Sequence, residues 1–131
     1  MQLFRFDPAA GRTVGDHGSN GVALAPIVAM PADRGVSIAL AYVHRGGRLG
    51  RHPAVCEQLF LVLRGSGWVS GDAGQRVPVR EGQGVHWVRG ESHEAGSDAG
   101  MAALIIESEG PLGPGPWLQA ATPDGSADIR R

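Results

Sequence analysis

Histidine is the residue type through which this chain has the means to do chemistry. Its five histidines are His17, His44, His52, His86 and His93. Imidazole titrates close to neutral pH, which suits it to general acid–base catalysis, and it is also the commonest protein ligand for transition metals. The sequence contains no carboxylate pair, no serine nucleophile elbow and no glycine-rich phosphate loop, and its lack of lysine excludes Schiff-base mechanisms. We therefore expect a site centred on histidine.

Glycines and histidines between residues 46 and 97 recur at a defined spacing. The recurring positions are Gly46, His52, Gly65, Gly82, Gly90 and His93. This frame resembles the two sequence motifs of the cupin superfamily, G-x5-H-x-H-x3,4-E-x6-G and G-x5-P-x-G-x2-H-x3-N. Ala54 and Gln58 stand where the first motif has its second His and its Glu, and Val88 and Ser97 stand where the second has Pro and Asn. The 16 residues from 66 to 81 match the short spacing of small bacterial cupins.

The resemblance implies an all-β fold, a small jelly-roll β-barrel or double-stranded β-helix, with a pocket inside. In cupins three His and one Glu bind a divalent metal there. This chain retains His52 and His93, but Ala54 cannot bind a metal and Gln58 offers only a neutral amide oxygen. Two imidazoles and an amide lack the negative charge that offsets a dication. We therefore expect either no cofactor or a weakly bound divalent transition metal, held by His52, Gln58 and His93.

The same frame predicts which side chains line the pocket. Gln58, Phe60 and Val62 alternate along one strand and so share its inner face, and we expect His86 to join them from a nearby strand. The two histidines of the motifs, His52 and His93, are the candidate catalytic groups of this pocket. Glu57 is the only acid that the sequence predicts beside the site, although strand parity directs it outward. Cys56 is read as a small buried hydrophobic residue.

Composition favours short strands joined by turns. The chain has 21 glycines and 9 prolines, which strongly disfavour helix interiors. Turn signals recur every 8 to 12 residues between 31 and 100, which is typical of a sandwich or barrel. The residues from His52 to Gly65 are also compatible with a buried helix, but flanking strand signals favour a strand. The predicted strands are 2–6, 22–30, 36–44, 48–54, 59–63, 68–70, 75–80, 84–88, 93–96 and 101–107.

The length of 131 residues corresponds to one domain. We expect a barrel domain at 1–110, including an N-terminal strand, and a Pro/Gly-rich tail at 111–131. Exposed apolar side chains predict a homodimer, formed by sheet packing or by exchange of the N-terminal strand; they come from Phe4, Phe6, Trp68, Trp87 and the strand 36–44. A net charge of −1 without a basic block argues against nucleic acid. No apolar run is long enough to span a membrane, so we expect a cytoplasmic protein.

These observations favour a small-molecule-binding barrel, either a metal-poor enzyme of the isomerase, cyclase or lyase type or a ligand sensor. A metal-dependent protein of the dioxygenase type with an altered ligand set is the second hypothesis. The third is a barrel without chemistry that serves a structural or sensing role. Fold alone cannot choose among them.

Overall fold

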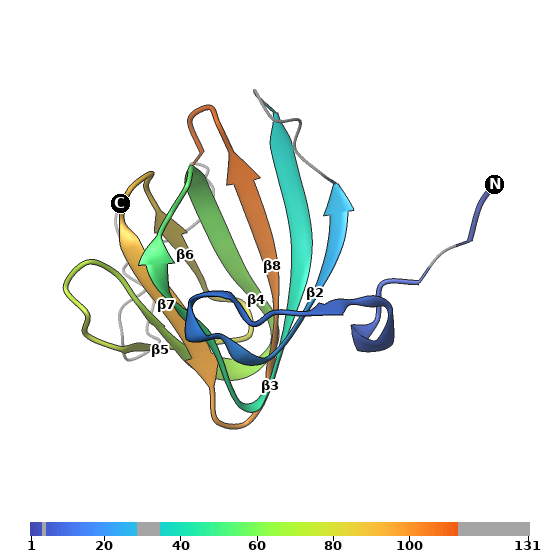
Figure 1. The fold of residues 1–131 in the computed structure, drawn as a ribbon, viewed down its shortest axis with the longest axis horizontal. Coiled ribbons are helices and arrows are strands. Elements are labelled where there is room, and N and C mark those ends of the chain that lie inside the picture. Colours follow the sequence, from blue (N-terminus) through green and yellow to red (C-terminus); the bar gives the residue numbers. More distant parts are fainter. Residues whose placement is uncertain (4, 29–34, 113–131) are drawn as a thin grey trace, which may run out of the picture.

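Eight β-strands make up nearly all of the regular structure in this computed structural model, which describes residues 1–3, 5–28 and 35–112 (Figure 1). Two short 3₁₀ helices precede most of them. The elements are η1 (Pro8–Ala10), β1 (Arg12–Thr13), η2 (Asp16–Gly18), β2 (Asn20–Val28), β3 (Val36–Pro53), β4 (Glu57–Ser70), β5 (Val77–Arg80), β6 (Gly84–Trp87), β7 (Ser92–Ser97) and β8 (Met101–Ser108). The predicted all-β class is confirmed.

The two longest strands, β3 and β4, connect the layers of the fold. Residues 36–43 of β3 pair with β8, whereas residues 47–53 pair with β7. Strand β4 is divided in the same way, with residues 57–65 along β8 and residues 68–70 along β7. One layer therefore runs β2-β3-β8-β4-β6 and the other β3-β7-β4-β5. The core and the pocket lie between the two layers.

Glycines bend these long strands where the sequence analysis expected them to end. We predicted separate strands at 36–44 and 48–54, and again at 59–63 and 68–70, but each pair is one continuous strand. Gly46 (φ 73°) and Gly65 (φ 79°) adopt a left-handed backbone that glycine tolerates. Such a residue produces a bulge or bend within a paired strand as readily as a hairpin turn. The predicted breaks at these glycines are therefore wrong, because the glycines bend continuous strands and do not end them.

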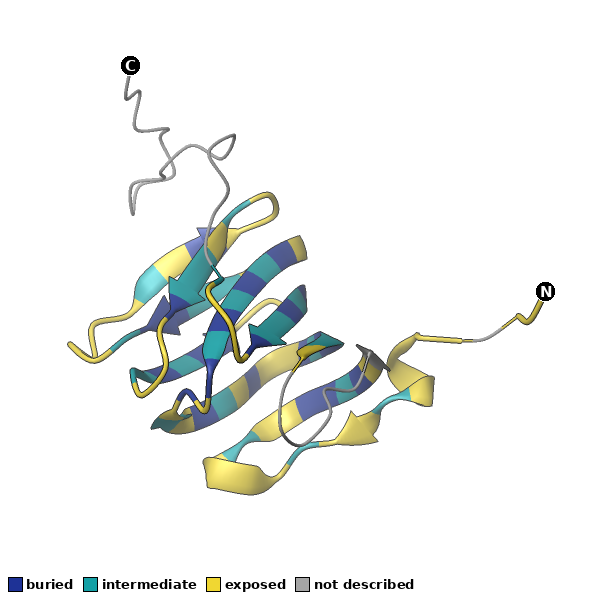
Figure 2. Ribbon diagram, turned by 90° about the horizontal axis from the view of Figure 1, so that it is seen from above, coloured by how far each residue is buried: buried dark blue, intermediate teal, exposed yellow. Residues whose placement is uncertain are grey.

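Side-chain burial alternates along the strands and defines one core between the layers (Figure 2). On β4, Gln58, Phe60 and Val62 are buried, while Leu59 and Leu61 between them are only partly covered. This alternation is the period-two pattern that the sequence predicted for the strand. The helix considered for this stretch does not form, because residues 57–70 are strand.

The predicted N-terminal strand is wrong for the residues that the structure describes there. Residues 1–3 reach away from the sheets (Figure 1), and neither they nor residues 5 and 6 pair with a strand. The Tyr42 hydroxyl donates a hydrogen bond to the Phe6 carbonyl (2.7 Å) and ties the chain to β3 just before η1. An alternating pattern alone does not make a strand, because strand formation depends on packing against neighbouring strands.

Two further expectations concern the chain ends and the membrane. The last residues of the predicted strand 22–30, and all of the predicted tail except 111 and 112, lie outside the described residues. Within the described ranges, no helix is both long and apolar enough to cross a membrane.

Candidate functional site

A cavity of about 210 Å³ opens between the two layers, beneath η2. Its walls come from β2, β3, β4, β6, β7 and β8, so residues far apart in the sequence meet there. The structure brings His52, Gln58, Phe60 and His93 to this one cavity. Apolar side chains, among them Leu49 and Ile105, form much of the remaining wall.

Three side chains form a row across one layer of the cavity. Gln58 on β4 lies directly opposite Trp87 on β6 and Glu107 on β8. Gln58 is only 8% exposed, yet its side-chain amide makes no hydrogen bond to any residue in the described ranges. Among the described residues no fully buried side-chain nitrogen or oxygen lacks a partner, so the Gln58 amide atoms keep contact with the open space of the cavity. The amide therefore faces the cavity with its hydrogen-bonding capacity unused by the protein.

Two histidines face this row from the other layer. His52 on β3 and His93 on β7 are direct partners in the sheet, with ring centroids 4.5 Å apart. A register shift between Leu49 and His52 changes the strand parity, so both of these side chains reach the cavity although they are three positions apart. The bulge is what turns His52 inward.

Backbone carbonyls orient both imidazoles. Nδ1 of His52 lies 2.7 Å from the Gly50 carbonyl oxygen, and Nδ1 of His93 lies 3.3 Å from the Glu91 carbonyl oxygen. Because a carbonyl oxygen only accepts, Nδ1 carries the proton in each ring. In the neutral rings this leaves the lone pair on Nε2.

Burial controls the charge of His93. This side chain is 4% exposed, and desolvation lowers its pKa from 6.5 to about 4, with smaller contributions from His52 and Arg51. The Trp87 ring, with its centroid 4.5 Å from that of His93, covers one side of the imidazole. His93 is therefore a neutral proton acceptor at neutral pH.

The η2 segment covers the cavity at the His52 side. His17 stacks on His52 with ring centroids 4.3 Å apart and an interplanar angle of 11°. His17 has a left-handed backbone (φ 57°, ψ 28°), which costs a non-glycine residue about 1–2 kcal/mol. The segment also lies against β3 so closely that a Cβ on Gly50 would overlap the His17 carbonyl, and Gly50 N–H donates to Ser19 Oγ (2.9 Å). Asp16 of the same segment also lines the cavity.

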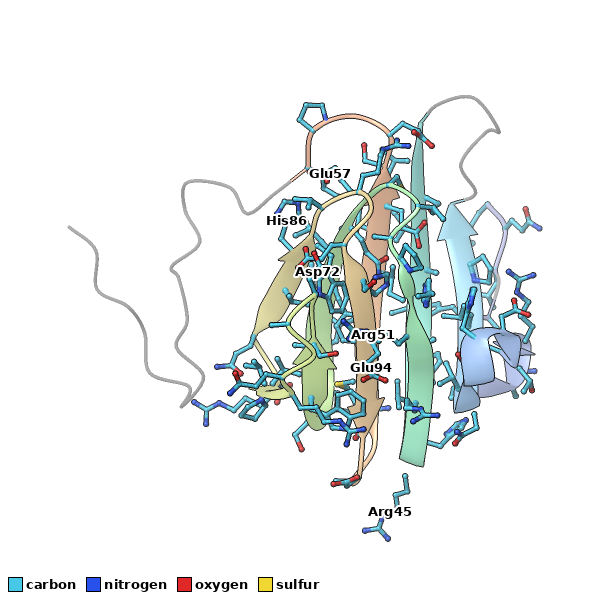
Figure 3. The ribbon with its side chains drawn as sticks, turned by 60° about the vertical axis from the view of Figure 1, so that its left-hand side comes forward. Arg45, Arg51, Glu57, Asp72, His86 and Glu94 are labelled. Atoms are coloured by element: carbon cyan, nitrogen blue, oxygen red, sulfur yellow. The ribbon has the colours of Figure 1, made fainter. Side chains whose placement is uncertain are left out.

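Two predicted pocket residues lie elsewhere. His86 lines a separate cavity beside β5, and its Nε2 is 3.3 Å from Glu57 Oε1 (Figure 3). Strand parity explains this placement, because His86 pairs with the outward-facing Leu59, whereas Trp87 pairs with Gln58. Val62 is packed into the core at 3% exposure and does not line the cavity.

The sequence analysis missed Glu107, Asp16 and His17. The sequence predicts Glu57 as the only acid beside the site, but its carboxylate accepts a hydrogen bond from the backbone N–H of Arg89 (2.9 Å) and pairs with His86. Glu107 shares strand parity with the inward-facing Ile105, so period-two reasoning on the last strand had the signal to find it. No comparable signal marked His17, which reaches the site through the path of a loop.

The residues present do not fit the metal site that the fold family implies. Ala54 is buried at 3% exposure and does not line the cavity. Within the described parts of the chain, no group of three or more His, Cys, Asp or Glu side chains is arranged to hold a metal ion. The donors expected from the motif reduce to two imidazoles and one neutral amide, a weak set for a divalent transition metal.

Comparison with known proteins gives a fold but no family assignment. No protein-family model matches the chain, and no curated protein matches it. A cupin-like protein from Thermotoga maritima superposes with a TM-score of 0.70 at 19% identity, over 90% of this chain and 89% of its own. A predicted oxalate decarboxylase from the same organism gives 0.67 at 19%, over 80% and 98%. The polyketide cyclase RemF from Streptomyces resistomycificus gives 0.65 at 22%, over 83% and 81%.

These identities are low, so the likeness concerns the fold and not the activity. The order of the strands, the two layers and the superpositions nevertheless agree with one another. The chain therefore has the jelly-roll β-barrel fold of the cupins, as the resemblance to the two cupin motifs implies.

Proposed function

We propose that this protein binds a small organic molecule in the cavity of His52, Gln58 and His93 and acts on it by metal-independent acid–base chemistry, as an isomerase, cyclase or lyase. One observation carries the proposal. The residue Gln58 is 8% exposed, its amide opens to the cavity without a hydrogen-bond partner among the described residues, and it meets a buried neutral imidazole there. Stability alone favours an apolar residue at such a position, whereas a ligand gives the amide a partner.

His93 is the proposed general base. Its Nδ1 is engaged with the Glu91 carbonyl, so Nε2 receives the proton from the substrate. With its pKa lowered to about 4, His93 is unprotonated and available at neutral pH but is a weak base, and the imidazolium that it forms is acidic enough to return the proton readily to another substrate atom. Proton removal and return leave no net change in the enzyme, so isomerisation, ring closure or elimination needs no co-reactant.

Gln58 is the proposed partner of the substrate oxygen. Its N–H groups are suited to stabilise negative charge that develops on a carbonyl oxygen while His93 holds the proton. Phe60 and Ile105 in the cavity wall limit the access of water, which strengthens such interactions. His52 is placed next to His93 and supplies a second imidazole for orientation or proton transfer.

The fold neighbours are compatible with this proposal. One of them, RemF, is a polyketide cyclase and has the same fold at a TM-score of 0.65. A cupin fold can thus carry a cyclase activity. The choice among isomerase, cyclase and lyase depends on the substrate, which the cavity limits in size but does not name.

Ligand-observed NMR with a library of single-ring fragments, in the presence of EDTA, tests the proposal. We expect hits that bind the wild-type protein and are lost in both Gln58→Leu and His93→Phe. Hits that carry an acidic C–H should exchange it with solvent deuterium in wild-type protein but not in His93→Phe. The matched control is His86→Gln, a histidine of the same strand region that lines a different cavity. The proposal fails if the library gives no hits, if the hits survive both substitutions, or if exchange requires added metal.

A further inference from the structure

Apart from histidine, the charged side chains that line the cavity are both acidic. Its lining residues include two carboxylates, Asp16 and Glu107, and no arginine. The chain contains no lysine at all. The arginine nearest to the histidines in sequence, Arg51, directs its guanidinium away, donating to Ser70 Oγ (3.2 Å) and to the Gly71 carbonyl (2.7 Å) (Figure 3). Among the described residues the wall therefore carries two carboxylates and no arginine, and Arg51 acts on His93 only as a nearby charge whose guanidinium is bonded elsewhere.

Glu107 is the more enclosed of the two acids. It is half-buried on β8, whereas Asp16 is exposed on η2. In the described parts of the chain its carboxylate has one hydrogen bond, from the Cys56 thiol (Sγ to Oε2, 3.8 Å), and no arginine or histidine partner. Burial and the charge of Glu107 raise the pKa of Cys56, which keeps that thiol protonated and donating. The other oxygen, Oε1, has no hydrogen bond to a described residue.

Gln58 supplies an independent sign that a ligand belongs beside Glu107. The two residues are direct partners across β4 and β8, and both line the cavity. As a residue Gln58 is only 8% exposed, and its side-chain amide has no hydrogen-bond partner among the described residues. A ligand nitrogen that carries two or more N–H groups would donate to Glu107 and to Gln58 Oε1 together. A ligand carboxylate at the same place would face an unpaired carboxylate and be repelled.

The remaining walls favour a flat ligand. The rings of His17, His52, His93 and Trp87 follow one another at centroid separations of 4.3 to 4.5 Å. Because His17 covers one face of His52 and Trp87 covers one side of His93, a planar ligand ring would pack edge-to-face or offset against this wall. A cavity of about 210 Å³ has the volume of about seven water molecules, which is enough for one ring with a small substituent.

We infer that the ligand of this cavity is a small planar organic cation, with its protonated nitrogen between Glu107 and Gln58 and its ring along the aromatic wall. The inference rests on the proposed function, because it names the substrate class of the same site. The charge of Glu107 excludes ligands that carry a carboxylate at this position. Neutral ligands bind less tightly than cations of the same shape.

Titration calorimetry with three ligands of one shape and different charge tests this inference. The probes are benzamidine (a cation), benzamide (neutral) and benzoate (an anion), in EDTA near neutral pH. We expect benzamidine to bind at least about tenfold more tightly than benzamide, and benzoate not to bind. Glu107→Gln removes the charge without changing the shape, so it should abolish the preference for benzamidine. The control Glu109→Gln removes an exposed carboxylate two residues further along, outside the cavity, and should keep it.

A second variant guards against a folding defect in Glu107→Gln. Gln58→Leu keeps the charge of Glu107 but removes the amide oxygen, and it should weaken benzamidine about tenfold. The inference is overturned if benzamide or benzoate binds as tightly as benzamidine, if a folded Glu107→Gln variant keeps the preference for benzamidine, or if Gln58→Leu leaves the affinity for benzamidine unchanged. If none of the three probes binds while neutral fragments bind the cavity in the NMR screen, the inference is wrong and the proposed function stands. If that screen is empty as well, both fail.

Discussion

At the scale of single residues, the site is defined by side chains whose polar groups the protein leaves unused. Gln58 and His93 are both buried, and each presents a hydrogen-bonding atom that no described residue engages, the amide of Gln58 and Nε2 of His93. Glu107 adds a carboxylate to the same cavity without an arginine beside it. A core selected for stability alone would hold apolar side chains at these positions. Their convergence is the strongest argument that the barrel binds something.

The pH dependence of stability should report the burial of His93. Its pKa is about 4 in the folded protein and near 6.5 in the unfolded chain. Between these values the unfolded state binds the proton more readily, so the free energy of unfolding falls as pH is lowered from 6.5 to 4. The expected loss is roughly 3 kcal/mol over the whole window, measured by urea denaturation at several pH values. His93→Phe should remove this part of the slope and His86→Gln should keep it; equal slopes in wild-type and His93→Phe would contradict the assignment.

The metal content follows from the donor set. Ala54 and Gln58 occupy two of the four positions that bind metal in the cupin motif, so protein purified without added metal should carry well under one equivalent by elemental analysis. The double substitution Ala54→His with Gln58→Glu adds an imidazole and a charge and should raise the affinity for zinc, measured by competition with a chelator. One equivalent of metal in the wild-type protein, lost in His52→Ala, would instead favour the metal-dependent hypothesis.

At the scale of elements, two backbone features decide which side chains reach the cavity. The bulge between Leu49 and His52 turns His52 inward, and the left-handed His17 places its ring on His52. Neither feature is visible as a periodic pattern. Each depends on how one segment of the chain meets another.

The contact between η2 and β3 can be tested through Gly50. A Cβ there would overlap the His17 carbonyl, so Gly50→Ala should displace η2 and separate His17 from His52. Because His17 would no longer cover the cavity, we expect a loss of about tenfold in ligand affinity. Because η2 is exposed, we expect only a small decrease in Tm. Gly15→Ala is the control, since its added Cβ meets nothing within 4 Å and its backbone is not left-handed. Similar affinities for the two variants would show that η2 does not contribute to binding.

The elements also show how far the sequence alone could go. Strand parity correctly placed Gln58 and Phe60 on the inner face, because alternation is a local property of one strand. Parity would also have found Glu107 and placed His86 outside the cavity, had it been applied to the strands 101–107 and 84–88. His17 and the inward turn of His52 could not be predicted, because a loop path and a bulge are set by tertiary contacts.

At the scale of the whole molecule, an apolar stripe remains on the outer face of the β3-β8-β4 layer. On β4 and β8 it consists of Leu59, Leu61, Leu63, Leu104 and Ile106, all partly or well exposed. The sequence predicts a dimer partly from exposed Trp68 and Trp87 side chains, but the structure does not leave these two rings free on the surface. Trp87 belongs to the core at 2% exposure, and Arg76 lies over the Trp68 ring at 3.7 Å, while Phe4 lies outside the described residues.

We expect this stripe to be the contact surface of a homodimer formed by sheet packing, because monomers rarely expose a continuous apolar patch on one sheet face. Leu63, at 48% exposure, stands at its open end. Light scattering on the purified protein should give twice the chain mass of 13.6 kDa, and Leu63→Arg should convert the protein to a monomer that keeps its fold by circular dichroism. Val55→Arg is the matched control, since Val55 is 72% exposed in the loop between β3 and β4, away from the stripe. A wild-type monomer at micromolar concentration, or a dimer unaffected by Leu63→Arg, would show that the stripe does not mediate association.

The dimer contact and the ligand site should be independent of each other, because the cavity lies on the inner face of the layer whose outer face carries the stripe. We therefore expect the monomeric variant and the wild-type dimer to bind a ligand with equal affinity.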